Sequence, residues 1–481
     1  MPQRHAWLIA SGAAVMSLAL AACGSQLDPD TVAQANGGTT QGGVAVPGGG
    51  GTTTGGGGST VAGGGGAGGA GVSTSGGGST SGGGGSAPEG TGANAATGGA
   101  KGASCGGFKN GPGIDSKTIT IGNASDISGP VPGLFESAQD AVKAYVAYFN
   151  ATSSICGRKL QLKTYDSRTD ASADQQAYTR GCDEVFAMVG SMSAFDSGGA
   201  GTAQSCGLPD IRSASVTSDR QGCSVCFGAQ STMAHEFQNA VPDYVKKNYP
   251  DAARHAAMLY INAGAAAENG KLQAEAMGKR GMHFSYVQGI DISEFNYAPY
   301  VQQMKDKGVE YVQMIASPDQ FVRLADAMQQ QGFKPDVFML DPTAYDPDYV
   351  KNGGDAAEGT TVFVNFTPFE EAGGNKELQL YLSWLQQVKP GAQPSFFGLF
   401  SWSAARLFVQ RAAGLGGKLS RSSLISSVKT VDNWTANNLH SPQHVGPRHT
   451  GDCWRFLQLR NGRWVPVGGN KYSCSGLTPV S

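Results

Sequence analysis

The sequence carries little charge and, beyond its N-terminal stretch, no long apolar run. Only 15 % of its 481 residues are charged and the formal net charge is −2, so we expect no nucleic acid partner, which requires a basic surface. No later segment reaches the roughly 20 apolar residues that cross a bilayer. No nucleophile elbow of the Gly-x-Ser-x-Gly kind follows a predicted strand, and a Gly-Lys-Ser/Thr loop and a His-Glu-x-x-His pair are missing. These absences argue against an enzyme, and nothing predicts a cofactor.

Residues 1–22 are typical of a secretion signal. Arg4 and His5 form a short basic region, and the apolar run from Trp7 to Leu20 is too short for a membrane-spanning helix. The run ends in Leu20-Ala21-Ala22-Cys23-Gly24, which is similar to a bacterial lipobox. We therefore predict a lipoprotein signal peptide, with Cys23 carrying the lipid that anchors the protein to the outside of the cell membrane. An ordinary signal peptide followed by a chance cysteine is the alternative.

Residues 23–115 are predicted to be a disordered linker behind that cysteine. Of the 72 glycines, 33 fall between Asn36 and Phe108, among Ser, Thr and Ala with almost no charged or aromatic side chains. Such a composition buries too little apolar surface to offset the loss of chain entropy. A Gly-rich coil of about 80 residues has an r.m.s. reach of about 50 Å, so we expect a tether that holds the folded part away from the membrane.

Eight cysteines remain if Cys23 is lipidated. An even number outside the cytoplasm favours four disulfides, although spacing alone does not give the pairing. Cys453 and Cys474 flank a predicted hairpin that turns at Asn461-Gly462, and they are candidates to join its ends. A single Cys-x-x-Cys pair predicts neither a zinc site nor a redox site. The eight are Cys105, Cys156, Cys182, Cys206, Cys223, Cys226, Cys453 and Cys474.

Strands and helices alternate over residues 116–478. Thr118–Gly122 is typical of a buried strand, and Val142, Tyr145 and Phe149 then recur on one helical face. Alternation of this kind predicts parallel sheets covered by helices on both faces. A body of about 370 residues exceeds a single core, so we predict an α/β fold of two doubly wound lobes. Further strands are expected at 159–165, 185–190, 208–213, 256–261, 283–289, 311–316, 337–340 and 361–364, and helices include 171–184 and 271–280.

A series of motifs follows in order between about residues 117 and 415. It comprises Asp126-Ile127-Ser128-Gly129-Pro130, Gly157-Arg158-Lys159-Leu160, Tyr165-Asp166-Ser167, Val185 to Ser191, Phe295-Asn296-Tyr297, Gln331-Gly332-Phe333 and Gly354 to Gly359. In this order the motifs resemble those of the branched-chain amino acid (Leu/Ile/Val-type) substrate-binding lipoproteins of ABC transporters, which have the type I periplasmic-binding-protein fold.

The resemblance implies two lobes joined by hinge crossings, with a ligand cleft outside the carboxyl ends of the strands. The lobes would be residues 117–229 with 366–430, and residues 230–365 with 431–478. The implied function is capture of a small ligand (an amino acid, an amide or a related small acid) by lobe closure and its delivery to an ABC permease. We expect a monomer. A lipoprotein sensor or protein-interaction module with the same fold is the alternative.

The resemblance also implies ligand-binding residues in the first lobe. A glycine turn that opens a helix leaves backbone N–H groups free to hold an anion. The family uses this turn and the end of the next strand to hold a ligand carboxylate. The corresponding residues here are Ser191, Ser193, Ser213, Ala214 and Ser215. Helix capping by Ser191 or Ser193 is the alternative role.

The second lobe departs from the family pattern. Asn262-Ala263-Gly264-Ala265-Ala266 stands where amino acid binders have a tyrosine, and Ala316-Ser317 replaces another aromatic. Asp341 is the candidate acceptor for a ligand ammonium, with a simple role in a strand-end turn as the alternative. A buried ligand ammonium needs a carboxylate or several other acceptors, because an unpaired buried charge is costly. The loss of the aromatics argues against branched-chain amino acids and for a larger or less polar ligand.

Two further groups are weaker candidates. Phe135, Tyr260 and Trp402 lie where aromatics could face a cleft, although core positions are the commoner role of such residues. His440, His444 and His449 form a His-rich loop, but carboxylates are scarce around it and we predict no metal site.

Overall fold

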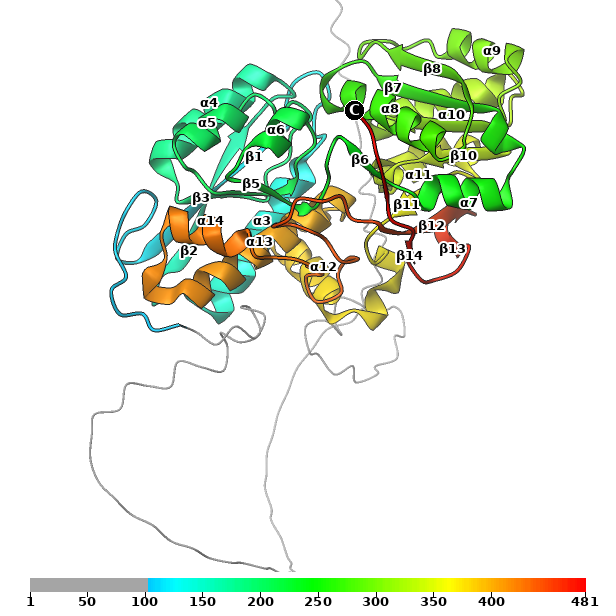
Figure 1. Ribbon diagram of the computed structural model, residues 1–481. Helices are drawn as coiled ribbons and strands as arrows, with labels where there is room; N and C mark the ends of the chain where they lie inside the picture. Colours follow the sequence, from blue (N-terminus) through cyan, green and yellow to red (C-terminus); the bar gives the residue numbers. More distant parts are fainter. Residues whose placement is uncertain (1–102) are drawn as a thin grey trace, which may run out of the picture.

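The computed structural model describes residues 103–481. They form two α/β lobes that lie side by side, with β6 (Glu236–Gln238) between them (Figure 1). The predicted fold of two α/β lobes is confirmed. The predicted signal peptide, Cys23 and the linker up to residue 102 lie outside the described residues.

The first lobe is built on five parallel strands in the order β2-β1-β3-β4-β5. The two faces of this sheet contribute to different apolar clusters: Ile121 packs with Tyr145 of α3, and Met188 packs with Tyr178 of α4. Helices therefore cover both faces, which explains why seven of the eight residues of β1 are buried. The strands are β1 (Thr118–Ser125), β2 (Lys159–Asp166), β3 (Ala187–Val189), β4 (Asp210–Ala214) and β5 (Cys226–Gln230).

The helices of the first lobe come from two parts of the chain. The late helix α13 packs against both the sheet and α3, and its Trp402 is fully buried with its ring 4.7 Å from that of Tyr145. Figure 1 shows α12, α13 and α14 in orange against the cyan and green lobe. The helices are α3 (Glu136–Thr152), α4 (Ala171–Glu184), α5 (Ala200–Ser205), α6 (Ser218–Gly222), α12 (Lys376–Val388), α13 (Phe396–Leu415) and α14 (Arg421–Val428).

The second lobe repeats the same strand order and extends it. Its parallel strands run β8-β7-β9-β10-β11, and β12 and β13 continue the sheet in antiparallel fashion. The strands are β7 (Ala256–Ile261), β8 (Phe284–Ile290), β9 (Tyr311–Ile315), β10 (Val337–Leu340), β11 (Thr361–Val364), β12 (Cys453–Arg460) and β13 (Arg463–Val467). The helices are α7 (Ala240–Asn248), α8 (Gly264–Lys279), α9 (Ala298–Asp306), α10 (Pro318–Gln330) and α11 (Pro347–Ala357).

The predicted hairpin joins β12 and β13. Asn461 and Gly462 both have positive φ, 52° and 71°, which is the backbone of a two-residue hairpin turn. Past the hairpin, β14 (Ser473–Cys474) pairs with β12, and β15 (Leu477–Pro479) pairs with β6. The chain end is thereby fastened beside the crossing between the lobes.

All eight predicted cysteines are paired in four disulfides. Cys453–Cys474 joins the ends of the hairpin segment, as expected. The other bonds are Cys105–Cys156, Cys182–Cys206 and Cys223–Cys226. The Cys-x-x-Cys pair is therefore a buried disulfide between α6 and β5.

The linker prediction extends too far at its C-terminal end. Residues 103–115 belong to the folded body, because Cys105 is bonded to Cys156 and the Gly417 N–H donates to Ser104 O at 2.9 Å. Arg158 also lies over the ring of Phe108, 3.9 Å from its centre. These contacts offset the loss of chain entropy that the glycine-rich segment incurs when it is ordered.

Three stretches of chain cross between the lobes, at about 231–235, 365–368 and 441–452. The buried side chain of Gln443 accepts through Oε1 from the Ser231 N–H at 3.0 Å, and Ser231 Oγ accepts from the His444 N–H at 2.9 Å. The Ser441 N–H donates to Asn365 O at 2.7 Å. The crossings are thus bonded to one another and form a single hinge.

The boundaries expected for the lobes remain a proposal. The contacts of the loop 431–450 change one of these boundaries. Trp434 and His440 of this loop both bond Ser403 of α13, at 2.9 and 2.8 Å. The loop accordingly packs on the first lobe, and we place the start of the last second-lobe segment near β12.

Candidate ligand-binding cleft

A cavity of about 260 Å³ lies where the carboxyl ends of the two sheets face each other. Its walls are the turns that follow β3 and β4 in the first lobe and β7, β9 and β10 in the second. In doubly wound folds ligands bind outside the carboxyl ends of the strands. An apolar cavity of about 150 Å³ already holds benzene, so this space is sufficient for a small organic solute.

Most of the cavity wall is apolar. Phe135, Phe396 and Phe397 line it from the first lobe, and Phe363 and Trp454 line it from the second. Five side-chain amides and several hydroxyls supply polar contacts: Gln230, Gln238, Asn269, Gln273, Gln320, Thr169, Thr232, Ser317, Thr343 and Thr450. The charged residues that line it are Glu236 and Asp341, both acidic.

The predicted glycine turn after β3 is present, but its serines serve the fold. Gly190 has a φ of 66°, and a Cβ there would lie 2.4 Å from Val142 Cγ2. Ser191 Oγ accepts from the Ala124 N–H at 3.1 Å, and Ser193 Oγ accepts from the Phe195 N–H at 3.1 Å. Both serines are fully buried. Neither bond is the helix cap named as the alternative role: Ser191 bonds β1, Ser193 bonds the turn itself, and the next helix, α5, begins after Gly199.

The other three predicted residues of this wall are also buried beside the cavity. Ser213 donates through Oγ to Phe397 O at 3.0 Å. Ala214 ends β4, and the carbonyl of Ser215 accepts from Thr232 Oγ1 at 2.6 Å. Neither these three nor Ser191 and Ser193 line the cavity; its wall is formed by their neighbours Met192, Ala194 and Val216. Ligand contact by the five residues stays a prediction.

Asp341, the candidate residue of the second lobe, lies in the cavity wall. Its Oδ1 accepts from the Thr343 N–H at 2.7 Å, which caps a short 3-10 turn over Pro342–Ala344. Desolvation by burial raises the pKa of this carboxyl to about 6. Asp341 can therefore serve both as a residue of the turn and as the candidate acceptor for a ligand ammonium.

Asp341→Asn is expected to stabilise the ligand-free protein at neutral pH. Because folding raises the pKa of Asp341 from 3.8 to about 6, its contribution to the free energy of unfolding falls as the pH rises through this range. Asn removes the cost, about 1–3 kcal/mol at pH 7.5, and keeps the oxygen that accepts from Thr343. Thermal unfolding should show the gain at pH 7.5 and none at pH 4.

The control for this prediction is Asp319→Asn, an exposed change on α10. It should leave the difference between the two pH values unchanged. An equal gain at pH 7.5 and pH 4 for Asp341→Asn would contradict the role of burial.

Three residues of α8 in the second lobe form hydrogen bonds with the first lobe at the edge of the cavity. The Ala265 N–H donates to Ala194 O at 2.9 Å, and Asn269 Nδ2 donates to Val216 O at 2.9 Å. Glu268 accepts from both the backbone N–H and the hydroxyl of Ser218, at the start of α6. These bonds hold the two lobes together on this side of the cleft. The sequence prediction missed them because the partners are about 50 to 70 residues apart.

Of the three aromatic candidates, only Phe135 lines the cavity. Tyr260 is buried under α8, where Gly270 lies against its ring. Trp402 is in the core and donates through Nε1 to Glu377 at 2.7 Å. These two therefore have the commoner role, a position in the core, and not the role of facing the cleft.

The histidines of the predicted loop have different side-chain partners, although the backbones of His444 and His449 pair in a β-bridge. His440 is buried against Ser403, His444 pairs with Asp432 at 2.6 Å, and His449 pairs with Glu236 at 3.1 Å. Among residues 103–481, the one group of three metal-capable side chains is Asp452 with Cys453 and Cys474. The two sulfurs of that group are joined in a disulfide.

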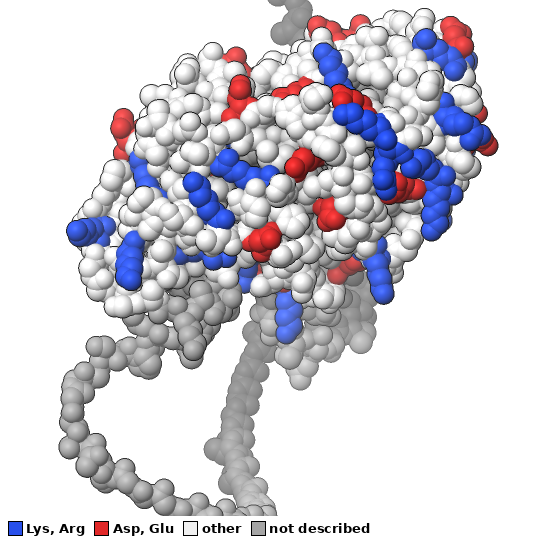
Figure 2. Space-filling model, viewed as in Figure 1, with Lys and Arg blue, Asp and Glu red and all other residues white. Residues whose placement is uncertain are grey.

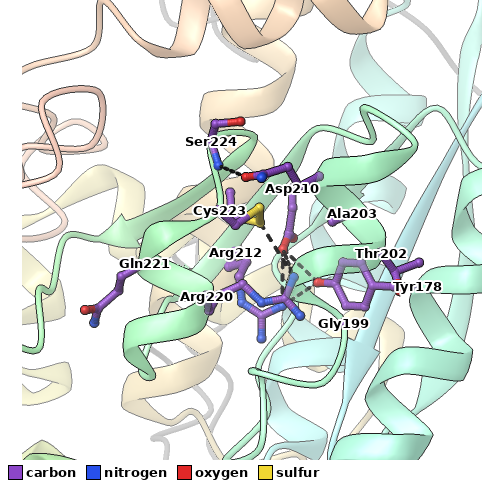
Figure 3. The surroundings of a disulfide bond; sticks show 12 residues. Tyr178, Gly199, Thr202, Ala203, Asp210, Arg212, Arg220, Gln221, Cys223 and Ser224 are labelled. Carbon is purple, nitrogen blue, oxygen red and sulfur yellow. Dashed lines mark hydrogen bonds and ion pairs between the residues drawn. A yellow bond between two sulfur atoms is a disulfide. The ribbon is translucent and has the colours of Figure 1, made fainter.

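A fully buried charge cluster lies behind the first wall of the cleft. Figure 3 shows its members Tyr178, Asp210, Arg212 and Arg220. Arg220 contacts Asp174 at 2.8 Å and Asp210 at 3.0 Å, and Arg212 contacts Asp210 at 3.3 Å. The hydroxyl of Tyr178 donates to Asp210 at 2.8 Å. Arg220 Nε also donates to the backbone oxygen of Asp196 at 2.7 Å, so the cluster fixes the turn that borders the cavity.

Figure 2 shows acidic and basic side chains scattered over a largely uncharged face, more densely on the second lobe. Within residues 103–481, no helix is both long enough and apolar enough to cross a membrane.

Two doubly wound lobes, a hinge of three crossings and a cavity between facing strand ends define a protein of the periplasmic-binding type. The sequence profile of the periplasmic binding protein family matches residues 118–463. The chain belongs to this family.

Solved structures of similar fold support the assignment. The fatty acid ABC transporter substrate-binding protein from Thermomonospora curvata is 18 % identical, with a TM-score of 0.66 over 77 % of this chain and 95 % of that one. The branched-chain amino acid transporter substrate-binding protein LivJ from Streptococcus pneumoniae, in complex with isoleucine, is 15 % identical, with a TM-score of 0.62 over 74 % and 99 %.

A third structure is the ABC transporter solute-binding protein from R. palustris in complex with 4-hydroxybenzoate. It is 16 % identical, with a TM-score of 0.62 over 75 % of this chain and 98 % of that one. At these identities the likeness concerns the fold. No curated protein matches the chain in sequence.

Proposed function

We propose that the protein is an extracytoplasmic solute-binding protein that captures a small, mainly apolar solute for an ABC importer. The observation that carries the proposal is the apolar cavity of about 260 Å³ between the lobes. Pockets of this kind, apolar with a few placed polar groups, are typical of small-molecule sites. The proteins of similar fold named above include binders of isoleucine and of 4-hydroxybenzoate.

In this proposal the solute is captured when the lobes close about the hinge and the hydrogen bonds across the cleft form. A solute that contacts both walls interacts better with the closed arrangement than with an open one, and so shifts the population toward closure. The hydrogen bonds from α8 to Ala194, Val216 and Ser218 form only when the lobes meet. We propose that the closed form is the one that a permease recognises. Solute capture requires no catalytic group. The proteins of similar fold named above are likewise substrate-binding proteins.

The proposal includes an anchor. Cys23, in its lipobox-like context, would carry the lipid, and the glycine-rich residues that follow would let the folded body move above the membrane. Mass spectrometry of the intact protein from its host tests this part alone. A mature chain that begins at Cys23 with an added diacylglycerol supports it, and an unmodified cysteine removes the anchor but not the solute site.

Thermal unfolding of the intact chain with a panel of small amines, amides, acids and neutral aromatics tests solute binding. At a concentration of about 100 times Kd, a ligand adds about 2.7 kcal/mol to the free energy of unfolding, so a true ligand raises the melting temperature by several degrees. Ala266→Trp, which fills the cavity, should abolish the effect.

Glu275→Trp is the matched control, because it adds the same side chain to an exposed position of the same helix. It should retain binding. If no small solute stabilises the protein, or if Ala266→Trp binds as tightly as the natural chain, the cavity is not a ligand site and the proposal fails.

A further inference from the structure

Two buried carboxylates of the protein accept hydrogen bonds from the backbone N–H groups at which a ligand carboxylate is expected. Asp126 accepts through Oδ2 from the Ala194 N–H at 2.8 Å, directly behind the cavity wall. Its Oδ1 accepts from Ser167 Oγ at 2.6 Å and from the Thr169 N–H at 3.0 Å. Asp126 is fully buried. The turn after β3 is therefore already occupied by a carboxyl group that belongs to the protein.

Asp196 plays the same part at the end of β4. Its Oδ2 accepts from the Val216 N–H at 3.0 Å, and its Oδ1 accepts from Thr217 Oγ1 at 2.6 Å. It is also fully buried, with the Nε of Arg212 3.7 Å away. A ligand carboxylate placed here would have to displace Asp196 and would leave a buried charge without its hydrogen bonds, which is costly.

In the second lobe, too, backbone N–H groups at the strand ends already donate to acceptors within the protein. The Ser317 N–H and hydroxyl both donate to Gln320 Oε1, at 3.0 Å each. The Thr343 N–H is bonded to Asp341, and the Ala265 N–H is bonded across the cleft to Ala194 O. These N–H groups are therefore not available to a ligand anion.

The charge of the cleft favours a cation. No Lys, Arg or His is among the residues that line the cavity. Glu236 is paired with His449, whereas Asp341 has no cationic partner within the described chain. A neighbouring cavity of about 210 Å³ shares Leu134, Thr343, Phe396 and Phe397 with the first. It is lined by Glu136, Asp140, Asp346 and Asp348, and its one cation, Lys389, pairs with Glu136 and Asp140.

We infer that the solute is an apolar molecule that carries a basic nitrogen and no free carboxylate, and that Asp341 receives its ammonium group. This inference rests on the proposed function and specifies its substrate class. The apolar part of the solute lies against the aromatic wall formed by Phe135, Phe397 and Trp454. The ammonium and Asp341 form a charge-assisted hydrogen bond, which is stronger than a neutral one. Amino acids and simple organic acids are poor ligands, because the site offers their carboxylate neither a cation nor a free turn.

Matched probes that differ only in the polar end group test the inference. One series is hexylamine, hexanamide and hexanoate; the other is 4-hydroxybenzylamine, 4-hydroxybenzamide and 4-hydroxybenzoate. Binding to the intact chain is measured by calorimetry at pH 7.5, with melting temperatures as a second readout. In each series the amine is expected to bind at least about tenfold more tightly than the carboxylate, as one charged hydrogen bond allows.

Asp341→Asn separates the charge from the shape of the site. It should weaken binding of the amines by about tenfold or more and change binding of the amides by less than about threefold. Asp319→Asn, which removes an exposed charge outside the cavity, should change neither. Because the asparagine side chain keeps an oxygen that accepts from the Thr343 N–H, the Asp341→Asn variant is expected to fold, and melting in the absence of ligand verifies this.

The outcomes distinguish the two proposals. Carboxylates or amides that bind as tightly as the amines overturn the inference and leave solute capture intact, as does amine binding that is indifferent to Asp341→Asn. Absence of binding by all six probes, together with absence of binding across the wider panel, overturns solute capture itself.

Discussion

Arg220→Met is expected to lower the free energy of unfolding by about 3–5 kcal/mol, the typical cost of removing one partner from a buried ion pair. Arg220 is fully buried and contacts the carboxylates of Asp174 and Asp210. Burial raises the pKa of Asp174 to about 6 even beside this arginine. Without Arg220 the pKa of Asp174 rises further, so the loss of stability should be larger at pH 8 than at pH 5.

Chemical unfolding at the two pH values measures the effect. Arg180→Met is the control, because Arg180 lies on the exposed side of α4 and its ion pair with Glu184 is long, at 3.6 Å. Exposed pairs contribute about 0–1 kcal/mol. Equal losses for Arg220→Met and Arg180→Met would show that the cluster does not stabilise the first lobe.

Glu268→Ala is expected to weaken solute binding by about 10–100-fold with little change in the stability of either lobe. The Glu268 carboxylate accepts two hydrogen bonds from Ser218 in the opposite lobe, and hydrogen bonds to charged groups contribute about 1.5–3 kcal/mol. Because these bonds form only on closure, their loss destabilises the closed state. Calorimetry with the tightest ligand from the panel measures the change in Kd.

Glu275→Ala removes a glutamate from the same helix without touching the first lobe. Glu275 is exposed and pairs only locally with Lys279, at 2.8 Å, so its replacement should leave Kd within about twofold. If Glu268→Ala and Glu275→Ala bind the solute equally well, the bridge from α8 does not contribute to closure.

The inner strands of the sheets were predictable because they are buried on both faces. The strands Ala256–Ile261, Val337–Leu340 and Thr361–Val364 and the helix Ala171–Glu184 begin and end where the sequence predicts. Short apolar runs between turn residues define such strands without reference to the rest of the fold. The hairpin at Asn461-Gly462 was equally clear from local turn chemistry.

The second-lobe helix predicted at 271–280 begins earlier, at Gly264. Its first turn consists of small residues with no helical periodicity, and the contact of Ala265 with the first lobe fixes its start. A long-range contact of this kind leaves no local pattern in the sequence.

The details of the binding site were less predictable than the fold. The turn after β3 and Asp341 border the cavity, but the neighbours of the predicted serines, not the serines themselves, line it, and ligand contact stays a prediction. Which of two adjacent residues faces a cleft depends on the orientation of the turn, and that is set by Asp126 and Asp196. Their acidic character near two strand ends was the signal that the sequence offered.

The attachment of residues 103–115 has a mechanical consequence. Cys105 is covalently linked to Cys156, and Ser104 is bonded to Gly417, both in the first lobe. Any force transmitted along the chain from its N-terminal side is therefore delivered to the first lobe and not to the hinge or to the second lobe. Because the crossings between the lobes lie outside the path of this force, pulling on the N-terminal side should neither open nor close the cleft.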